Sequence, residues 1–103
     1  MKLHPLRYSL VKISPVSTPI PVLINQIREN ITYLSGTRGL SQSSVHIVHS
    51  EKKKDLYIIL RSRREDLRLI QAAALMLDVG YVEVVRVSGT IKKLRLEIAE
   101  KAF

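Results

Sequence analysis

The chain of 103 residues contains no cysteine and no tryptophan, and aromatic residues make up only 5% of it. Without cysteine the protein has no disulfide, no thiolate nucleophile and no cysteine-ligated zinc site. The chain also lacks any run of 18 apolar residues, and its first residues lack the apolar core of a signal peptide. We therefore predict neither a transmembrane helix nor a secreted protein, and we expect a cytosolic location.

Acidic residues are scarce as well, with 9 Asp and Glu against 17 Lys and Arg, which gives a formal net charge of +8. An excess of this size in a small domain predicts a polyanionic partner, and nucleic acid is favoured over an acidic membrane surface. The hydrophobic fraction of 46% and the charged fraction of 25% are typical of a globular protein. At this length we expect one folded domain over residues 1–103.

Hydrophobic periodicity predicts four strands and three helices. Residues 7–14 alternate, with Ser9, Val11 and Ile13 on one face. Apolar residues at helical spacing predict a helix over residues 20–35, which Gly36 would terminate. The other expected elements are strands over residues 45–49, 55–62 and 81–87, a helix from about Arg63 to residues 78–80, and a terminal helix along Ile91, Leu94, Ile98 and Ala102.

This β-α-β-β-α-β order with a terminal helix predicts an α+β, ferredoxin-like (split β-α-β) sandwich. It would hold an antiparallel four-stranded sheet with two helices on one face, plus the C-terminal helix. The third strand carries apolar residues on both faces, with Tyr57 and Ile59 opposite Leu56, Ile58 and Leu60. We therefore expect the open face of the sheet to be covered by the terminal helix or by another subunit.

The segment Ser88-Gly89-Thr90 joins the fourth strand to the terminal helix, and Lys92, Lys93 and Arg95 follow at once. Cations in a first helical turn are mildly destabilising, because the free backbone N–H groups make that end partly positive. A bound anion would reverse this effect, and helix N-termini preceded by glycine are common phosphate sites. From the residues alone, a phosphate site and a simple capped helix with solvated lysines explain the pattern equally well.

Further arginines flank this segment. Arg61 and Arg63 share a strand face and, with Arg86 on the fourth strand, extend the expected basic surface. Arg38, in the loop of residues 36–44, either contacts RNA or keeps that loop in solution. Ser62 and Glu65 match the S-x-x-E capping box, so Ser62 is expected to cap the second helix.

Catalytic and metal-binding patterns are missing. His46 and His49 fall on opposite faces of a regular strand, so they make no pair of metal ligands. No catalytic Ser, His or Glu motif occurs, and Glu83 has no second carboxylate beside it. Tyr8 and Tyr57 lie on strands, but the aromatic signature of RNA-recognition motifs is absent. We predict no catalytic residue, no metal site and no bound cofactor.

Motifs along almost the whole chain resemble those of the ribonuclease P protein component 2 family. They are Arg7-Tyr8, Ile58-Ile59-Leu60-Arg61, Glu65-Asp66-Leu67-Arg68 and, the most specific, Arg86-Val87-Ser88-Gly89-Thr90-Ile91-Lys92-Lys93. The family provides the small protein subunit of archaeal and eukaryotic ribonuclease P, which removes the 5′ leader of precursor tRNA. At Ser62 family sequences often carry a cysteine instead.

The resemblance implies an accessory subunit that binds the catalytic RNA and supports its fold, while the RNA uses Mg²⁺ to cleave precursor tRNA. It also implies a barrel-shaped partner, ribonuclease P protein component 3, and a homodimer within a dimer of heterodimers. Two alternatives are another RNA-binding protein of the ribosomal type and an acylphosphatase-type enzyme. The second is disfavoured because Ser14-Pro15-Val16-Ser17 lacks the glycine or arginine of a phosphate loop.

Overall fold

The four predicted strands form one antiparallel sheet. The computed structural model describes residues 6–14, 19–35, 46–77 and 80–101. Its elements are β1 (Leu6–Ser14), α1 (Ile20–Ser35), β2 (His46–Lys52), β3 (Leu56–Arg63), the 3-10 turn η2 (Arg64–Asp66), α2 (Leu67–Leu75), β4 (Tyr81–Ser88) and α3 (Ile91–Lys101). The strand order is β2-β3-β1-β4, with antiparallel neighbours throughout. This arrangement confirms the predicted α+β, ferredoxin-like class.

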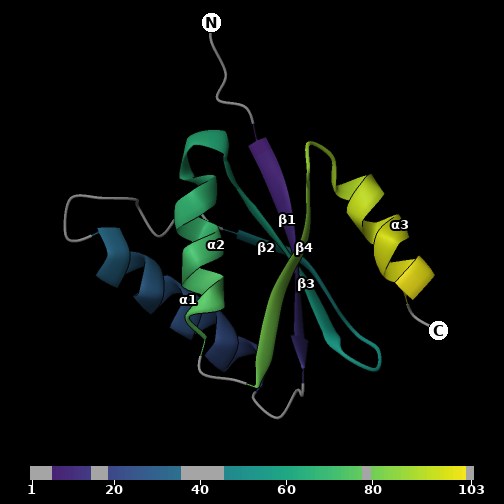
Figure 1. The fold of residues 1–103 in the computed structure, drawn as a ribbon, viewed down its shortest axis with the longest axis horizontal. Coiled ribbons are helices and arrows are strands. Elements are labelled where there is room, and N and C mark those ends of the chain that lie inside the picture. Colours follow the sequence, from purple (N-terminus) through teal and green to yellow (C-terminus); the bar gives the residue numbers. More distant parts are fainter. Residues whose placement is uncertain (1–5, 15–18, 36–45, 78–79, 102–103) are drawn as a thin grey trace, which may run out of the picture.

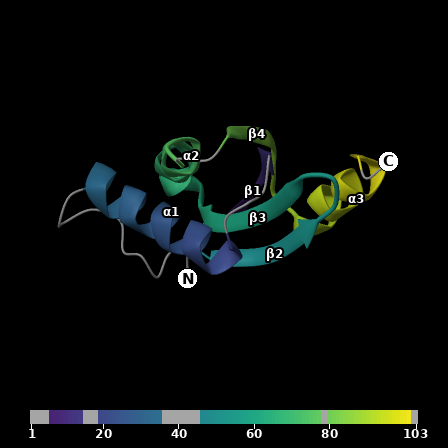
Figure 2. The same cartoon turned by 90° about the horizontal axis from the view of Figure 1, so that it is seen from below.

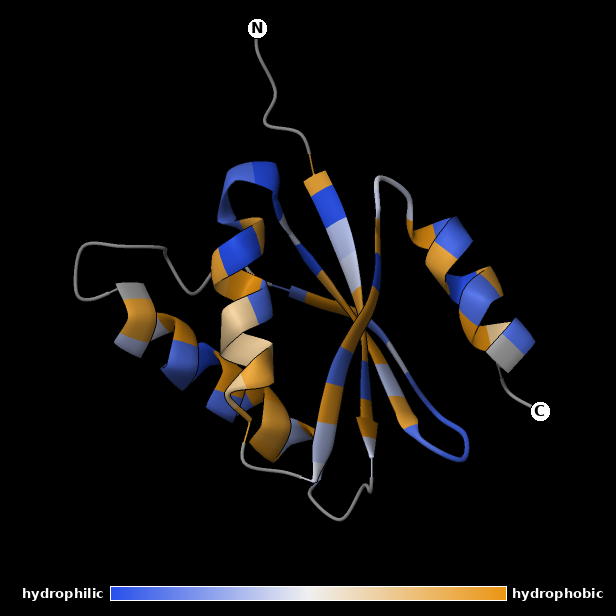
Figure 3. Ribbon diagram, viewed as in Figure 1, coloured by the Kyte–Doolittle hydropathy of each residue, from blue (hydrophilic) through white to orange (hydrophobic). Residues whose placement is uncertain are grey.

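The helices divide between the two faces of the sheet. α1 and α2 lie on one face, and α3 lies on the other (Figures 1 and 2). α3 follows directly from the end of β4 and runs back beside the sheet (Figure 1). Polar residues gather at the β2–β3 hairpin tip and along one side of α3, while the strand centres are apolar (Figure 3).

The larger core lies between the sheet and the helix pair. Helix α1 contributes Leu23, Ile27 and Ile31, each at most 2% exposed; Leu34, the last residue of the apolar stripe that predicted the helix, is 39% exposed. The rest of this core comes from β1, β3 and α2, namely Val11, Ile13, Leu56, Ile58, Leu60, Ile70, Ala73, Ala74 and Leu77. Because β1 and β3 are the two central strands, this core fixes the sheet against both helices.

A second core lies under α3. Leu94 and Ile98 are fully buried there against Leu10, Tyr57 and Ile59 on the opposite face of the sheet. Ile91 of α3 packs at the edge of the same cluster. The terminal helix is therefore one cover of the apolar open face, as the residues on both sides of β3 predicted.

Strand β2 differs from its expected form. It continues to Lys52 instead of ending at His49, because a strand at a sheet edge accommodates charged side chains. The register also shifts between Ile47 and His49, so His46 lies opposite Arg61 and His49 opposite Ile59. These partners are two residues apart on β3, so the bulge places both histidines on the α3 face, and the expected opposite orientation was wrong.

The expected capping role of Ser62 was also wrong. Ser62 is the penultimate residue of β3, and its buried Oγ makes no hydrogen bond within the described part of the chain. Neither η2 nor α2 has a side-chain hydrogen bond at its N-cap. Instead, Arg63 Nε donates to Asp66 Oδ2 at 2.9 Å. Because the strand extends one residue further than expected, the helical region begins at Arg64 and the α-helix proper at Leu67.

Candidate nucleic-acid interface

The charged side chains in the first turn of α3 are all cationic. Thr90 N–H donates to Ser88 Oγ at 3.1 Å, and this short turn directs the chain from β4 into the helix. Lys92, Lys93 and Arg95 are exposed and form no ion pair with a described residue, and the first turn contains no acidic side chain. The positive end of the helix and two adjacent lysines therefore act together on any nearby anion.

A second basic group lies beside this turn. A Cβ placed on Gly89 would lie 3.9 Å from Nη1 of Arg7, an ordinary contact distance. Sequence reasoning did not include Arg7 in the basic surface, since it is distant from Gly89 in the chain. The pairing of β1 with β4 brings them together, because Ser88 lies opposite Tyr8.

Arg61 lies on the α3 face of the sheet, at the same end of the strands as Ser88. Across the four strands the register aligns Ser88 of β4, Tyr8 of β1, Arg61 of β3 and His46 of β2. Arg61 is partly exposed and forms no ion pair with a described residue. The register thus aligns Arg61 with Ser88, which precedes α3, with Tyr8 of β1 between them.

The other two arginines are already paired. Arg63 Nε lies 2.9 Å from Asp66 Oδ2, and Arg86 Nε lies 3.1 Å from Glu97 Oε1 on α3. The side chain of Arg86 remains 57% exposed, so it can still contact a ligand through its other nitrogens. These two arginines hold local structure, whereas the α3 cations and Arg61 form no ion pair with a described residue.

A groove separates the β2–β3 hairpin from α3. Its volume is about 620 Å³, and its walls are Glu51, Ile91, Lys92, Arg95, Leu96 and Ala99. Glu51 is a residue that sequence reasoning missed, because alternation along an isolated strand does not reveal which helix will face it. Lys53 at the hairpin tip lies 3.1 Å from Glu51 Oε2 and forms an ion pair with it.

Within the described residues, the other sites considered from the sequence form no further cluster. Arg38 lies outside the described residues. No three His, Asp or Glu side chains in the described ranges come together as a metal site. Among the same residues, no helix combines the length and apolar character needed to span a bilayer.

The fold and this surface together define a small ferredoxin-like domain with a cationic helix start suited to a polyanionic ligand. A family model described as the Rpp14/Pop5 family matches residues 7–99, and the chain belongs to this family. The family is one of ribonuclease P protein subunits, so the chain functions in the ribonucleoprotein that removes the 5′ leader of precursor tRNA. This finding favours the ribonuclease P interpretation over the ribosomal and acylphosphatase-type alternatives. No curated protein matches the chain in a sequence search.

Proposed function

We propose that this subunit binds ribonuclease P RNA through the surface formed by Ser88, Gly89, Thr90, Lys92, Lys93 and Arg95, with Arg7 and Arg61 beside it. The observation that carries the proposal is the first turn of α3, where exposed cations follow a short turn and no acidic side chain stands among them in that helical turn. Phosphate contacts in protein–nucleic acid complexes come mainly from such lysines, arginines and helix N-termini.

Catalysis in this proposal belongs to the RNA and its Mg²⁺, and the protein acts as the component 2 subunit. Its partners are the catalytic RNA, precursor tRNA, the barrel-shaped component 3 subunit and a second copy of the chain in a dimer of heterodimers. The location is the cytosol. The resemblance of residues 86–93 to the component 2 motif supports this finer assignment.

The first experiment compares RNA binding by the wild-type chain and by the Lys92→Glu/Lys93→Glu variant over a range of salt concentrations. Loss of two phosphate contacts should weaken binding and reduce the slope of log K against log salt by about 1.4 to 1.8 units. Filter binding to ribonuclease P RNA would measure both quantities.

A matched control is the Arg28→Glu/Arg68→Glu variant. It makes the same change in net charge, but Arg28 and Arg68 are exposed on α1 and α2, which cover the opposite face of the sheet. Its loss of affinity should be smaller, through long-range charge alone. Equal losses in both variants would show that net charge, and not the start of α3, determines binding.

Reconstitution tests the role in the enzyme. Ribonuclease P RNA, the barrel partner and Mg²⁺ are assayed for 5′-leader cleavage with and without this chain. We expect stimulation by the wild-type chain and little by the Lys92→Glu/Lys93→Glu variant. No stimulation by the wild-type chain, with an RNA and partner known to be competent, would contradict the accessory role.

A further inference from the structure

The groove between the hairpin and α3 is lined by three kinds of side chain: acidic, cationic and apolar. One wall is a carboxylate, Glu51 on β2. The facing wall on α3 carries two cations, Lys92 and Arg95, and an apolar strip of Ile91, Leu96 and Ala99. Its volume of about 620 Å³ lies within the range of about 300–1,000 Å³ typical of small-ligand sites. A ligand complementary to these side chains presents an apolar body, an anion and hydrogen-bond donors.

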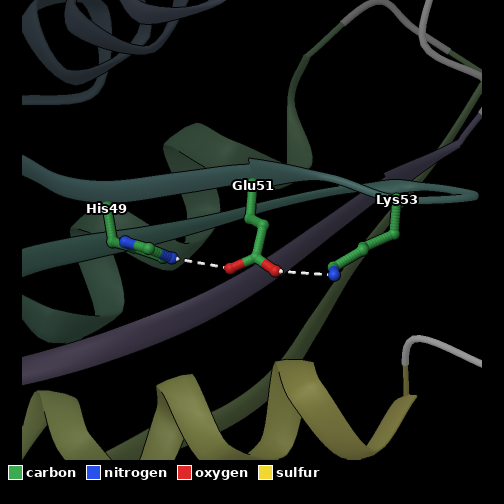
Figure 4. A network of polar contacts seen from close by, with 3 residues as sticks. All are labelled: His49, Glu51 and Lys53. Atoms are coloured by element: carbon green, nitrogen blue, oxygen red, sulfur yellow. Dashed lines mark hydrogen bonds and ion pairs between the residues drawn. The ribbon is translucent and has the colours of Figure 1, made fainter.

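The carboxylate of Glu51 is held in position from both sides. His49 Nε2 lies 3.0 Å from Oε1, and Lys53 Nζ lies 3.1 Å from Oε2. The three side chains extend from the hairpin on the side where α3 lies (Figure 4). The hydrogen bond with His49, followed by that with Lys53, lowers the pKa of Glu51 below its ordinary value. The group is therefore charged at neutral pH, and each oxygen can accept a further hydrogen bond.

The opposite wall contains an apolar side chain that the fold does not bury. Leu96 is 56% exposed, although its neighbours in the helix, Leu94 and Ile98, are fully buried. Leu96 lines the groove together with Ala99, while Lys92 and Arg95 supply positive charge on the same helix. A nucleotide satisfies all of these features. The faces of its base pack against apolar side chains, the edge of the base carries N–H donors, and the phosphate is an anion.

We propose that this groove binds one unpaired guanine nucleotide of the RNA partner, with Glu51 accepting from the guanine N1–H and N2–H groups. The proposal rests on the proposed RNA-binding function. Guanine presents two adjacent donors on its Watson–Crick edge, and they match the two oxygens of a carboxylate. Adenine, cytosine and uracil each place an acceptor next to a donor there, and an acceptor is repelled by Glu51. Edge recognition of unpaired bases is the usual basis of sequence-specific RNA binding.

The test uses three single-stranded RNA hexamers, uridine hexamer and the same hexamer with one central guanine or one central adenine. Fluorescence anisotropy should show the wild-type chain binding the guanine hexamer about tenfold more tightly than the adenine hexamer, as expected for one good bidentate base contact. Glu51→Gln should abolish this preference without weakening binding of the uridine hexamer, since it removes a negative charge. Glu29→Gln, the same change on α1, should retain the preference.

Methyl NMR locates the contact. Addition of the guanine hexamer should shift the signals of Leu96 and Ala99 more than the uridine hexamer does. Equal affinity for the guanine and adenine hexamers, or equal methyl shifts, would overturn the guanine site while leaving RNA binding by the start of α3 intact. Failure of the guanine hexamer to bind a chain that does bind ribonuclease P RNA would overturn it as well. If ribonuclease P RNA itself does not bind, the proposed function fails with it.

Discussion

At the scale of single residues, Arg61, Arg63 and Arg86 differ in whether a carboxylate lies beside them. Arg63 and Arg86 each lie close to a carboxylate, at 2.9 Å from Asp66 and 3.1 Å from Glu97. Arg61 has no such partner within the described ranges. A paired arginine is partly neutralised, so its contribution to RNA binding depends on whether its partner is removed.

Glu97→Gln tests this dependence. The change breaks the ion pair with Arg86 and frees that guanidinium, so RNA affinity should rise and the salt slope should steepen by slightly less than one unit, about 0.8. Because Arg86 is 57% exposed, unfolding free energy should change by less than about 1 kcal/mol. Salt-dependent binding and urea denaturation measure the two effects.

Glu100→Gln provides the control, since Glu100 is exposed on the same helix and pairs with no described cation. It makes the same change in net charge without freeing an arginine. If Glu100→Gln raises RNA affinity and steepens the slope as much as Glu97→Gln does, Arg86 contributes nothing specific to the interface.

At the scale of elements, α3 connects the apolar face of the sheet to the cationic surface. Leu94 and Ile98 hold it against Leu10, Tyr57 and Ile59. Lys92, Lys93 and Arg95 project from the same two turns, so their positions depend on this packing. The groove between the hairpin and α3 depends on this packing too, because α3 forms one wall of the groove.

Leu94→Ala should therefore weaken both stability and RNA binding. Leu94 is fully buried, and truncation of such a leucine costs about 2–5 kcal/mol of unfolding free energy. Urea denaturation and filter binding measure the two losses. Leu96→Ala is the comparison, because Leu96 is 56% exposed and its loss should leave the unfolding midpoint nearly unchanged. A similar loss of stability in both variants would contradict the packing of α3 described above.

The whole molecule carries a net charge of +8, and its acidic residues are too few to neutralise it. Exposed cations repel one another in the folded state, and salt screens that repulsion over about 10 Å at 0.1 M. Salt also displaces the protein from RNA, because phosphate contacts release counterions. Added salt should therefore stabilise the folded chain and weaken its affinity for RNA.

Raising NaCl from low to moderate concentration should increase the thermal midpoint of the free chain while weakening its RNA binding. The Arg28→Glu/Arg68→Glu variant lowers the net charge by four units, from +8 to +4, so salt should raise its midpoint less. Differential scanning fluorimetry across a salt series checks both statements. An equal rise in the two proteins would mean that charge repulsion does not limit stability.

Local patterns predicted much of the fold because they depend on neighbours in the chain. The bounds of α1, Ile20–Ser35, match the prediction, since an apolar stripe at helical spacing needs no information from distant residues. The alternation along β1 likewise grouped Val11 and Ile13 on one face, and the structure shows that this face joins the core with α1 and α2. The two apolar faces of β3 predicted a cover on each side of the sheet.

Only the tertiary structure decided which distant groups meet. The bulge in β2 turned His46 and His49 to one face, and strand pairing brought Arg7 to Gly89. The packing of α3 against the sheet placed Glu51 across a groove from Lys92 and Arg95. The sequence by itself determined the elements, the basic charge and the cations at the start of α3, because these follow from composition and local spacing. Register and packing join residues on different elements, so the pairing of Arg86 with Glu97 and the groove were decided only by the tertiary structure.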